Sequence, residues 1–105
     1  MTENINEGST EEILNKINRE TSKMQWSELL PFFAKGMAIY VSHNLDLIKV
    51  AYALAEDDKA QFETWTNEGT VANVTDEQAS AWHESHVVVW ATVIKPWVLV
   101  QPIVD

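Results

Sequence analysis

The chain of 105 residues contains no cysteine, only three glycines and three prolines, and seven basic residues against sixteen acidic ones. The absence of cysteine excludes disulfides, thiolate nucleophiles and cysteine-ligated zinc. With so few glycines, neither a glycine-rich phosphate loop nor a nucleophile elbow can be assembled. No apolar run approaches the roughly 20 residues that a membrane-spanning helix needs, so we expect no membrane span.

The shortage of basic residues gives a formal net charge of −9. A charge of this sign opposes binding to phosphates, so we expect neither nucleic acid nor an anionic membrane surface as a partner. It steers basic partners toward the surface instead. The polar and acidic N-terminus lacks the pattern of a secretory signal, and we expect a soluble cytoplasmic protein.

Five tryptophans are the most informative feature that the sequence does contain. They recur across the predicted elements beside valines and leucines, which predicts that their rings fill one aromatic-rich interior. The length suits a single domain, and no linker or repeat interrupts it. We therefore expect one domain over residues 9–105, preceded by a disordered tail at residues 1–8.

Capping motifs and hydrophobic spacing predict an alternation of helices and short strands. Ser9, Asp58 and Thr75 are each followed three residues later by Glu or Gln, which is the capping-box pattern of a helix start. The predicted helices are 9–22, 26–36, 45–56, 58–69 and a short one from 75, and the predicted strands are 37–41, 71–74, 87–94 and 97–100. Lys95-Pro96 excludes a type I′ turn, since proline cannot take a positive φ, and predicts a wider turn, a bulge or a continued edge strand.

These elements predict an α+β fold with helices packed on a small antiparallel sheet. Their order also fits a winged-helix domain with one inserted helix. In that arrangement the helix after Asp57-Asp58 occupies the place of a recognition helix, but Glu63 and Glu68 add to its negative charge and only Lys59 opposes it. Such a surface repels DNA, so a winged shape would serve as a platform for protein interaction.

Two clusters have side chains capable of chemistry. His83 and His86 are spaced i, i+3, whereas the helical metalloprotease pattern needs i, i+4, and the helix is expected to end between them. We therefore expect no metal site, and these two histidines are only weak candidates for one. Asp57 and Asp58 offer paired carboxylates, although a helix cap explains Asp58 equally well.

An ordered set of landmarks covers most of the chain. It comprises Trp26-Ser-Glu-Leu, Phe33-Ala-Lys-Gly36, Leu45-Asp-Leu, Val50-Ala, Ala55-Glu-Asp-Asp58, Trp65, Gly69-Thr-Val71, Asp76-Glu-Gln-Ala79, Trp82, Trp90-Ala and Pro96-Trp-Val-Leu-Val-Gln101. This set resembles a small bacterial family known as domain of unknown function 2288. The resemblance implies a compact single-domain bacterial protein without an established activity or cofactor, and it transfers no catalytic residue.

Together these observations favour a non-enzymatic interaction or regulatory protein, with no catalytic residue and no cofactor assigned. The candidate contact residues are Trp97 and Leu99, on a strand expected at a sheet edge, and the pair Asp57 and Asp58. The expected partner is another protein or a second copy forming a homodimer. The alternative is a small enzyme or a ligand- or metal-binding protein using Asp57, Asp58, His83 and His86, which must then converge on one pocket. In a third possibility, the acidic surface mimics nucleic acid and blocks a basic protein.

Overall fold

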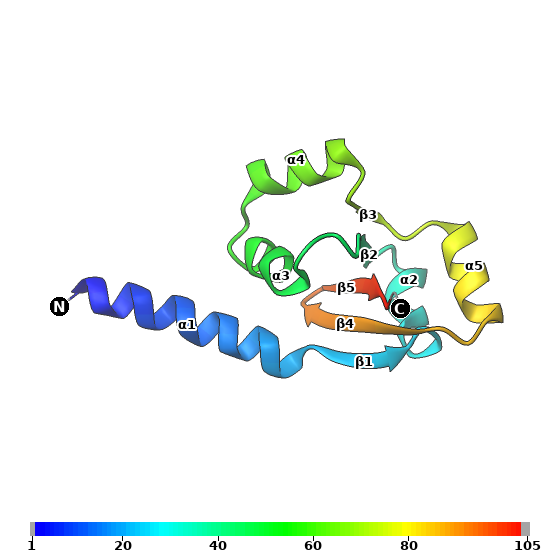
Figure 1. Cartoon of the computed structure of the whole chain (residues 1–105), viewed down its shortest axis with the longest axis horizontal. Coiled ribbons are helices and arrows are strands. Elements are labelled where there is room, and N and C mark those ends of the chain that lie inside the picture. The colour runs from blue at the N-terminus through cyan, green and yellow to red at the C-terminus, as the bar shows by residue number, and fades with distance from the viewer. Residues whose placement is uncertain (1, 104–105) are drawn as a thin grey trace.

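The computed structural model describes the backbone of residues 2–103 and the side chains from Thr10 to Ile103. It shows helices and a five-stranded sheet, which confirms the α+β class (Figure 1). The helices are α1 (Thr2–Glu20), α2 (Leu30–Ala34), α3 (Leu47–Ala55), α4 (Lys59–Glu68) and α5 (Asp76–Glu84), with a 3-10 helix η1 (Trp26–Leu29) before α2. The strands are β1 (Ser22–Gln25), β2 (Ala38–Val41), β3 (Val71–Asn73), β4 (Val88–Ile94) and β5 (Trp97–Pro102).

The strands lie in the order β1-β4-β5-β2-β3. All neighbours are antiparallel except β2 and β5, which run parallel with Ile39 opposite Leu99. The prediction of a purely antiparallel sheet is therefore wrong for the central pair. The prediction that Trp97–Val100 forms an edge strand is also wrong, because β2 covers the side of β5 that β4 leaves free. The true edges are β3 and β1, and β1 had no counterpart among the predicted elements.

Helices cover both faces of the sheet, so the molecule has two cores instead of the single one expected. Side chains alternate along β5, with Val98 and Val100 on the face of η1, α2 and α5, and Leu99 on the face of α1, α3 and α4. The first core holds the buried residues Trp26, Leu29, Ala38, Val74, Ala79, Val89, Ala91, Val98 and Val100. The second holds Ile17, Ile39, Val41, Leu47, Val50, Ala51, Val71 and Leu99.

The tryptophans fill these cores unequally. Trp26 is completely buried and meets Trp82 edge to face, with 5.1 Å between ring centroids. Trp65 and Trp97 are half-buried against the second core. Trp90 is 36% exposed, so the prediction that all the rings serve as interior filling is wrong for this one.

Two of the three predicted helix starts are capped as expected, and the third helix begins earlier than predicted. Thr75 and Gln78 form both bonds of a capping box at the start of α5, at 3.1 and 3.0 Å. Asp58 caps α4 by accepting from the backbone N–H of Gln61 at 3.2 Å. Helix α1 begins at Thr2, well before the predicted start at Ser9, and so runs through most of the predicted tail. Met1 and the side chains of residues 2–9 lie outside the described part.

The turn between β4 and β5 contains only Lys95 and Pro96, since Ile94 pairs with Trp97. The Lys95-Pro96 peptide is cis, which is the type VI arrangement with proline at the second central position. The prediction of a wider turn, a bulge or a continued edge strand is therefore wrong, although the turn is not of type I′.

The topology does not show a winged helix. Its central feature is instead the parallel pair β2–β5 inside a five-stranded mixed sheet. Across residues 2–103, none of the helices combines the length and the apolar composition that crossing a bilayer requires.

Candidate functional site

The junction between α3 and α4 places the two candidate carboxylates. Asp57 has a positive φ of 57°, and its N–H donates to the carbonyl oxygen of Leu54 at 3.1 Å. The N–H of Asp58 donates to the carbonyl oxygen of Ala53 at 2.9 Å. These two bonds form the Schellman motif that ends many helices. Both side chains are exposed, so the turn presents two adjacent carboxylates to solvent.

A groove with a volume of about 440 Å³ begins at this junction and runs between α4 and the sheet. Its wall is mainly apolar, with the side chains of Leu54, Phe62 and Trp97 among those that line it. Phe62 is held by an edge-to-face contact with Trp65, at 5.5 Å between centroids. The complete lining is Ile39, Ala53, Leu54, Asp57, Asp58, Lys59, Phe62, Thr66, Val71, Ala72, Asn73 and Trp97. We call this feature the α4 groove.

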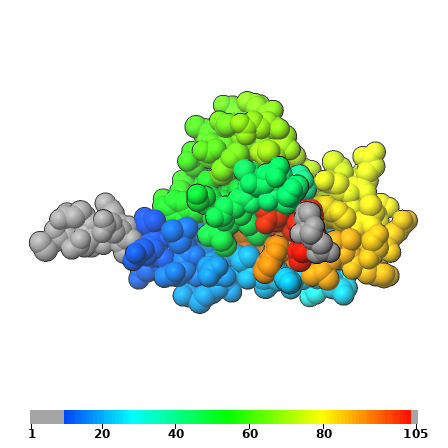
Figure 2. Space-filling model, viewed as in Figure 1, coloured from blue at the N-terminus to red at the C-terminus, as the bar shows by residue number. Residues whose placement is uncertain are grey.

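The α4 groove lies where α4 is only partly buried against the rest of the molecule. None of the residues of α4 is buried, although Phe62 and Trp65 face the second core. In Figure 2, α4 forms the upper end of the molecule and projects from its outline. An apolar hollow with a few polar groups at its border is the usual form of a binding site.

Three of the four predicted contact residues meet in this groove. Asp57 and Asp58 come from the α3–α4 junction, and Trp97 comes from the start of β5. Leu99 does not reach the groove, because it lies in the sheet centre with 0% exposure. Its selection as a contact residue rested on an edge position that β5 does not have.

The two histidines lie elsewhere. His83 is in the last turn of α5, and His86 follows that helix with a positive φ of 54°. The N–H of His86 donates to the carbonyl oxygen of His83 at 3.2 Å, and the N–H of Val87 donates to that of Trp82 at 3.0 Å. His86 therefore takes the left-handed position of a Schellman motif, which is a structural role.

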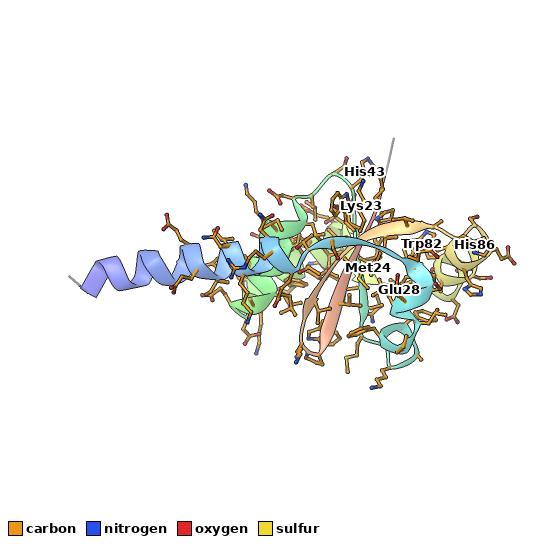
Figure 3. All side chains as sticks on the ribbon, turned by 90° about the horizontal axis from the view of Figure 1, so that it is seen from below. Lys23, Met24, Glu28, His43, Trp82 and His86 are labelled. Carbon is orange, nitrogen blue, oxygen red and sulfur yellow. The ribbon has the colours of Figure 1, made fainter. Side chains whose placement is uncertain are left out.

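The residues of the enzyme alternative do not converge. Asp57 and Asp58 line the α4 groove, whereas neither His83 nor His86 does. Figure 3 places His86 at the α5 end of the molecule. Among the side chains from Thr10 to Ile103, no group of three or more His, Asp or Glu is placed to hold a metal ion.

A second hollow, of about 690 Å³, lies between α1, the end of α3 and the β4–β5 turn. Lys16 and Lys95 line it together with Glu20 and Glu56, so its charges balance. It contains none of the candidate residues. We therefore assign the α4 groove, which gathers three of them, as the candidate site.

One exposed apolar surface was missed by sequence reasoning. Val88 is 40% and Trp90 36% exposed on β4, where the covering helices do not reach. The ammonium group of Lys23, on neighbouring β1, lies 5.3 Å from the centroid of the Trp90 ring. This is a cation–π contact that partly shields the ring. The run 87–94, which is apolar except for Thr92, concealed the exposure, since it predicts a central strand that is buried on nearly both faces.

The fold and the groove define a class of small α+β domain, in which helices cover both faces of a mixed sheet and one helix leaves an apolar hollow. The chain belongs to the family described as "Protein of unknown function (DUF2288)", whose model matches residues 12–102. This result confirms the resemblance found in the sequence.

A solved structure extends the comparison. The chain is similar to PA1075 from Pseudomonas aeruginosa, whose structure was determined by NMR in solution. The two sequences are 36% identical, and the match covers 89% of this chain and 86% of PA1075 with a TM-score of 0.79. A search of curated proteins gave no match.

Proposed function

We propose that this protein is a soluble, cytoplasmic, non-enzymatic interaction module, whose α4 groove binds a segment of a partner protein carrying basic residues next to a large apolar one. The observation that carries the proposal is the meeting of Trp97 with Asp57 and Asp58 in one hollow. The apolar wall accepts an apolar side chain, and the carboxylates attract a neighbouring Lys or Arg.

The charge of the chain favours a basic partner over a second copy. Each copy has a formal net charge of −9, and the lining of each α4 groove contains two carboxylates against the single ammonium group of Lys59, so two copies would approach each other with net charges of the same sign. Like charges in contact oppose association, whereas a basic partner is drawn in from a distance. A homodimer through this groove is therefore the less favourable arrangement.

Neutralising the two carboxylates tests the proposal. Asn retains the capping ability of Asp and tolerates a left-handed backbone, so Asp57→Asn/Asp58→Asn removes charge without removing the junction. The matched control is Asp76→Asn/Glu77→Gln, which makes the same change in the first turn of α5, outside the groove. Phage-displayed random dodecapeptides are selected on the wild-type protein, and the affinities of the enriched peptides are measured by fluorescence polarisation.

We expect the enriched peptides to combine Lys or Arg with a large apolar residue. The groove variant should bind them about fivefold more weakly than wild type, because each exposed ion pair contributes about 0.5 kcal/mol. The α5 control should bind like wild type, and salt should weaken wild-type binding. Equal affinity for the groove variant and wild type would contradict the proposal, as would a selection that enriches no peptide.

A further inference from the structure

We infer that the basic residue of the partner segment is an arginine, and that Trp97 is the residue of this protein that selects arginine over lysine. The guanidinium group stacks on the indole ring of Trp97 and donates to the carboxylates of Asp57 and Asp58. This inference rests on the proposed function and specifies the ligand of the same groove: a peptide with an arginine beside a large apolar residue.

The linings of the two hollows show that Trp97 lies beside the α3–α4 junction. Glu56, at the end of α3, and Lys95, in the β4–β5 turn, both line the second hollow, so these two segments are neighbours. Asp57 and Asp58 directly follow Glu56, and Trp97 directly follows the turn. All three line the α4 groove. The indole ring and the two carboxylates therefore share one end of that groove.

The α4 groove continues from this end along α4. Asp58, Phe62 and Thr66 all line it and are spaced four residues apart, which places them on one face of the helix. At the helical rise, Phe62 lies about 6 Å and Thr66 about 12 Å along the axis from Asp58. The apolar contact at Phe62 is thus close enough to the carboxylates for neighbouring side chains of one peptide to reach both.

Part of the Trp97 side chain is available to a ligand. Trp97 is half-buried, because it packs against the second core and also lines the groove. Among the described side chains, the ammonium group placed over an indole ring is that of Lys23, and the ring is Trp90. Lys59, although it lines the groove, makes no such contact with Trp97 in this part of the chain. The position over Trp97 is therefore left for a cation of the partner.

Arginine suits this arrangement better than lysine does. The guanidinium group is planar, so it stacks on an aromatic ring while the N–H donors at its rim remain free for carboxylates beside the ring. Two adjacent carboxylates, such as those of Asp57 and Asp58, match these several donors. The ammonium group of lysine is compact and more strongly hydrated, and placing it on an indole ring costs more of its hydration. The combination of Trp97 with the two carboxylates therefore favours arginine.

Replacing one side chain of the peptide tests this selection. The tightest-binding dodecapeptide from the phage selection, which we call the selected dodecapeptide, is made with arginine, lysine or citrulline at its basic position. Citrulline keeps the planar shape and removes the charge. We expect the lysine and citrulline versions to bind about fivefold more weakly than the arginine version in fluorescence polarisation. Equal affinities of the arginine and lysine versions, or enrichment of lysine at this position in the selection, would overturn the inference.

Substitutions in the protein test the role of Trp97. Trp97→Leu keeps an apolar side chain and removes the aromatic face, so the ratio of the affinities for the arginine and lysine versions should fall to about one. Trp97→Phe keeps a ring and should retain part of the preference. The matched control is Trp65→Leu, which removes another half-buried indole from the same core, outside the groove lining, and should retain all of it. Circular dichroism verifies that the variants are folded, and an unchanged ratio in Trp97→Leu would contradict the role of Trp97.

The variant Asp57→Asn/Asp58→Asn separates this inference from the proposed function. If wild type binds the arginine and lysine versions equally, and both bind more weakly to this variant, the selection of arginine is wrong and the interaction function stands. If this variant binds the arginine version as tightly as wild type does, the proposed function is wrong in its use of the carboxylates. Weaker binding to this variant, together with a preference of wild type for arginine that Trp97→Leu removes, supports both.

Discussion

Asp58 donates its backbone N–H to the carbonyl oxygen of Ala53 across 2.9 Å, and this bond closes α3. The carboxylate of Asp58 then caps α4 through the N–H of Gln61. One residue thus ends a helix and begins the next, and the chain reverses without a longer loop. This short junction holds Asp57 and Asp58 at the mouth of the α4 groove.

The left-handed position before Asp58 predicts a stabilising substitution. Asp57 has a φ of 57°, a conformation that is unfavourable for residues with a Cβ and free of this penalty for glycine. Asp57→Gly should therefore raise the free energy of unfolding by about 0.5–1 kcal/mol. Urea denaturation measures this change, and a loss of stability would show that the Asp57 side chain supports the junction.

Gly69 also has a left-handed backbone conformation, and replacing it should lower the stability instead of raising it. It ends α4 with a φ of 77°, and a Cβ built there meets no atom within 4 Å. Gly69→Ala should therefore lower the free energy of unfolding by about 1 kcal/mol through backbone conformation alone. An unchanged stability in the same urea assay would mean that the turn relaxes to a negative φ.

His86 occupies the equivalent position after α5. His86→Gly should raise the melting temperature, because a residue with a φ of 54° is replaced by one that tolerates it. If His86 instead served as a zinc ligand together with His83, adding zinc would raise the melting temperature of wild type but not of His86→Gly. Differential scanning calorimetry with and without zinc decides between the two, and we expect no effect of zinc on either protein.

Thr92 gives a prediction for the second core. It is 1% exposed, and its hydroxyl finds no hydrogen-bond partner among the described residues. Thr92→Val removes a buried, unpaired hydroxyl and should raise the free energy of unfolding by about 1 kcal/mol. The control is Thr21→Val, because the Thr21 hydroxyl donates to the carbonyl oxygen of Ile17 at 2.7 Å. Thr21→Val should therefore be destabilising. A loss of stability in both variants would contradict the assignment of the Thr92 hydroxyl as buried and unpaired.

Gln101 joins the sheet to the loop before α3. Its side-chain amide donates to the carbonyl oxygens of Ser42 at 2.9 Å and Leu45 at 2.8 Å. Gln101→Met removes both donors, and we expect a loss of about 1–3 kcal/mol in the free energy of unfolding. Gln101→Glu should cost more at neutral pH, since an ionised carboxylate can only accept and would face two carbonyl oxygens. Urea denaturation measures the loss of unfolding free energy in both variants. Equal losses for Gln101→Met and Gln101→Glu would contradict the prediction.

The sequence predicted the elements that depend on local chemistry. Thr75, Asp58 and Gly69 act within one helical turn of themselves, so their caps and stops follow from residue type and spacing alone. The helix α4 and the strands β2 and β4 are accordingly found close to their predicted positions. Even the junction at Asp57-Asp58 was located correctly, although its left-handed geometry was not foreseen.

Features that depend on distant pairings were not predictable in the same way. The parallel pairing of β5 with β2 joins segments separated by α3, α4 and α5, and no local pattern indicates it. Because of this pairing, Leu99 lies in the centre of the sheet and not at the edge where it was expected. Likewise, the strand β1 has no apolar alternation of its own, and it forms because β4 offers a partner.

The candidate site depends both on local residue chemistry and on contacts between distant segments. Asp57 and Asp58 could be selected from the sequence as adjacent carboxylates, and Trp97 as a ring following a proline turn. Their meeting in one groove depends on how α4 crosses the sheet, which only the tertiary structure reveals.

Two tryptophans, one half-buried and one exposed, make the central claim directly measurable. Trp97 lines the α4 groove, whereas Trp90 lies on the uncovered part of β4 beside Lys23. Trp26 is completely buried on the other face and serves as an internal reference. Each tryptophan gives a separate indole N–H signal in a proton–nitrogen correlation spectrum.

Titrating the selected dodecapeptide into nitrogen-15-labelled protein and following these signals is the most direct test of the account. We predict that the Trp97 indole signal shifts with the bound fraction while those of Trp90 and Trp26 stay in place. A shift of the Trp90 signal with an unchanged Trp97 signal would contradict the account and transfer binding to the β1–β4 surface.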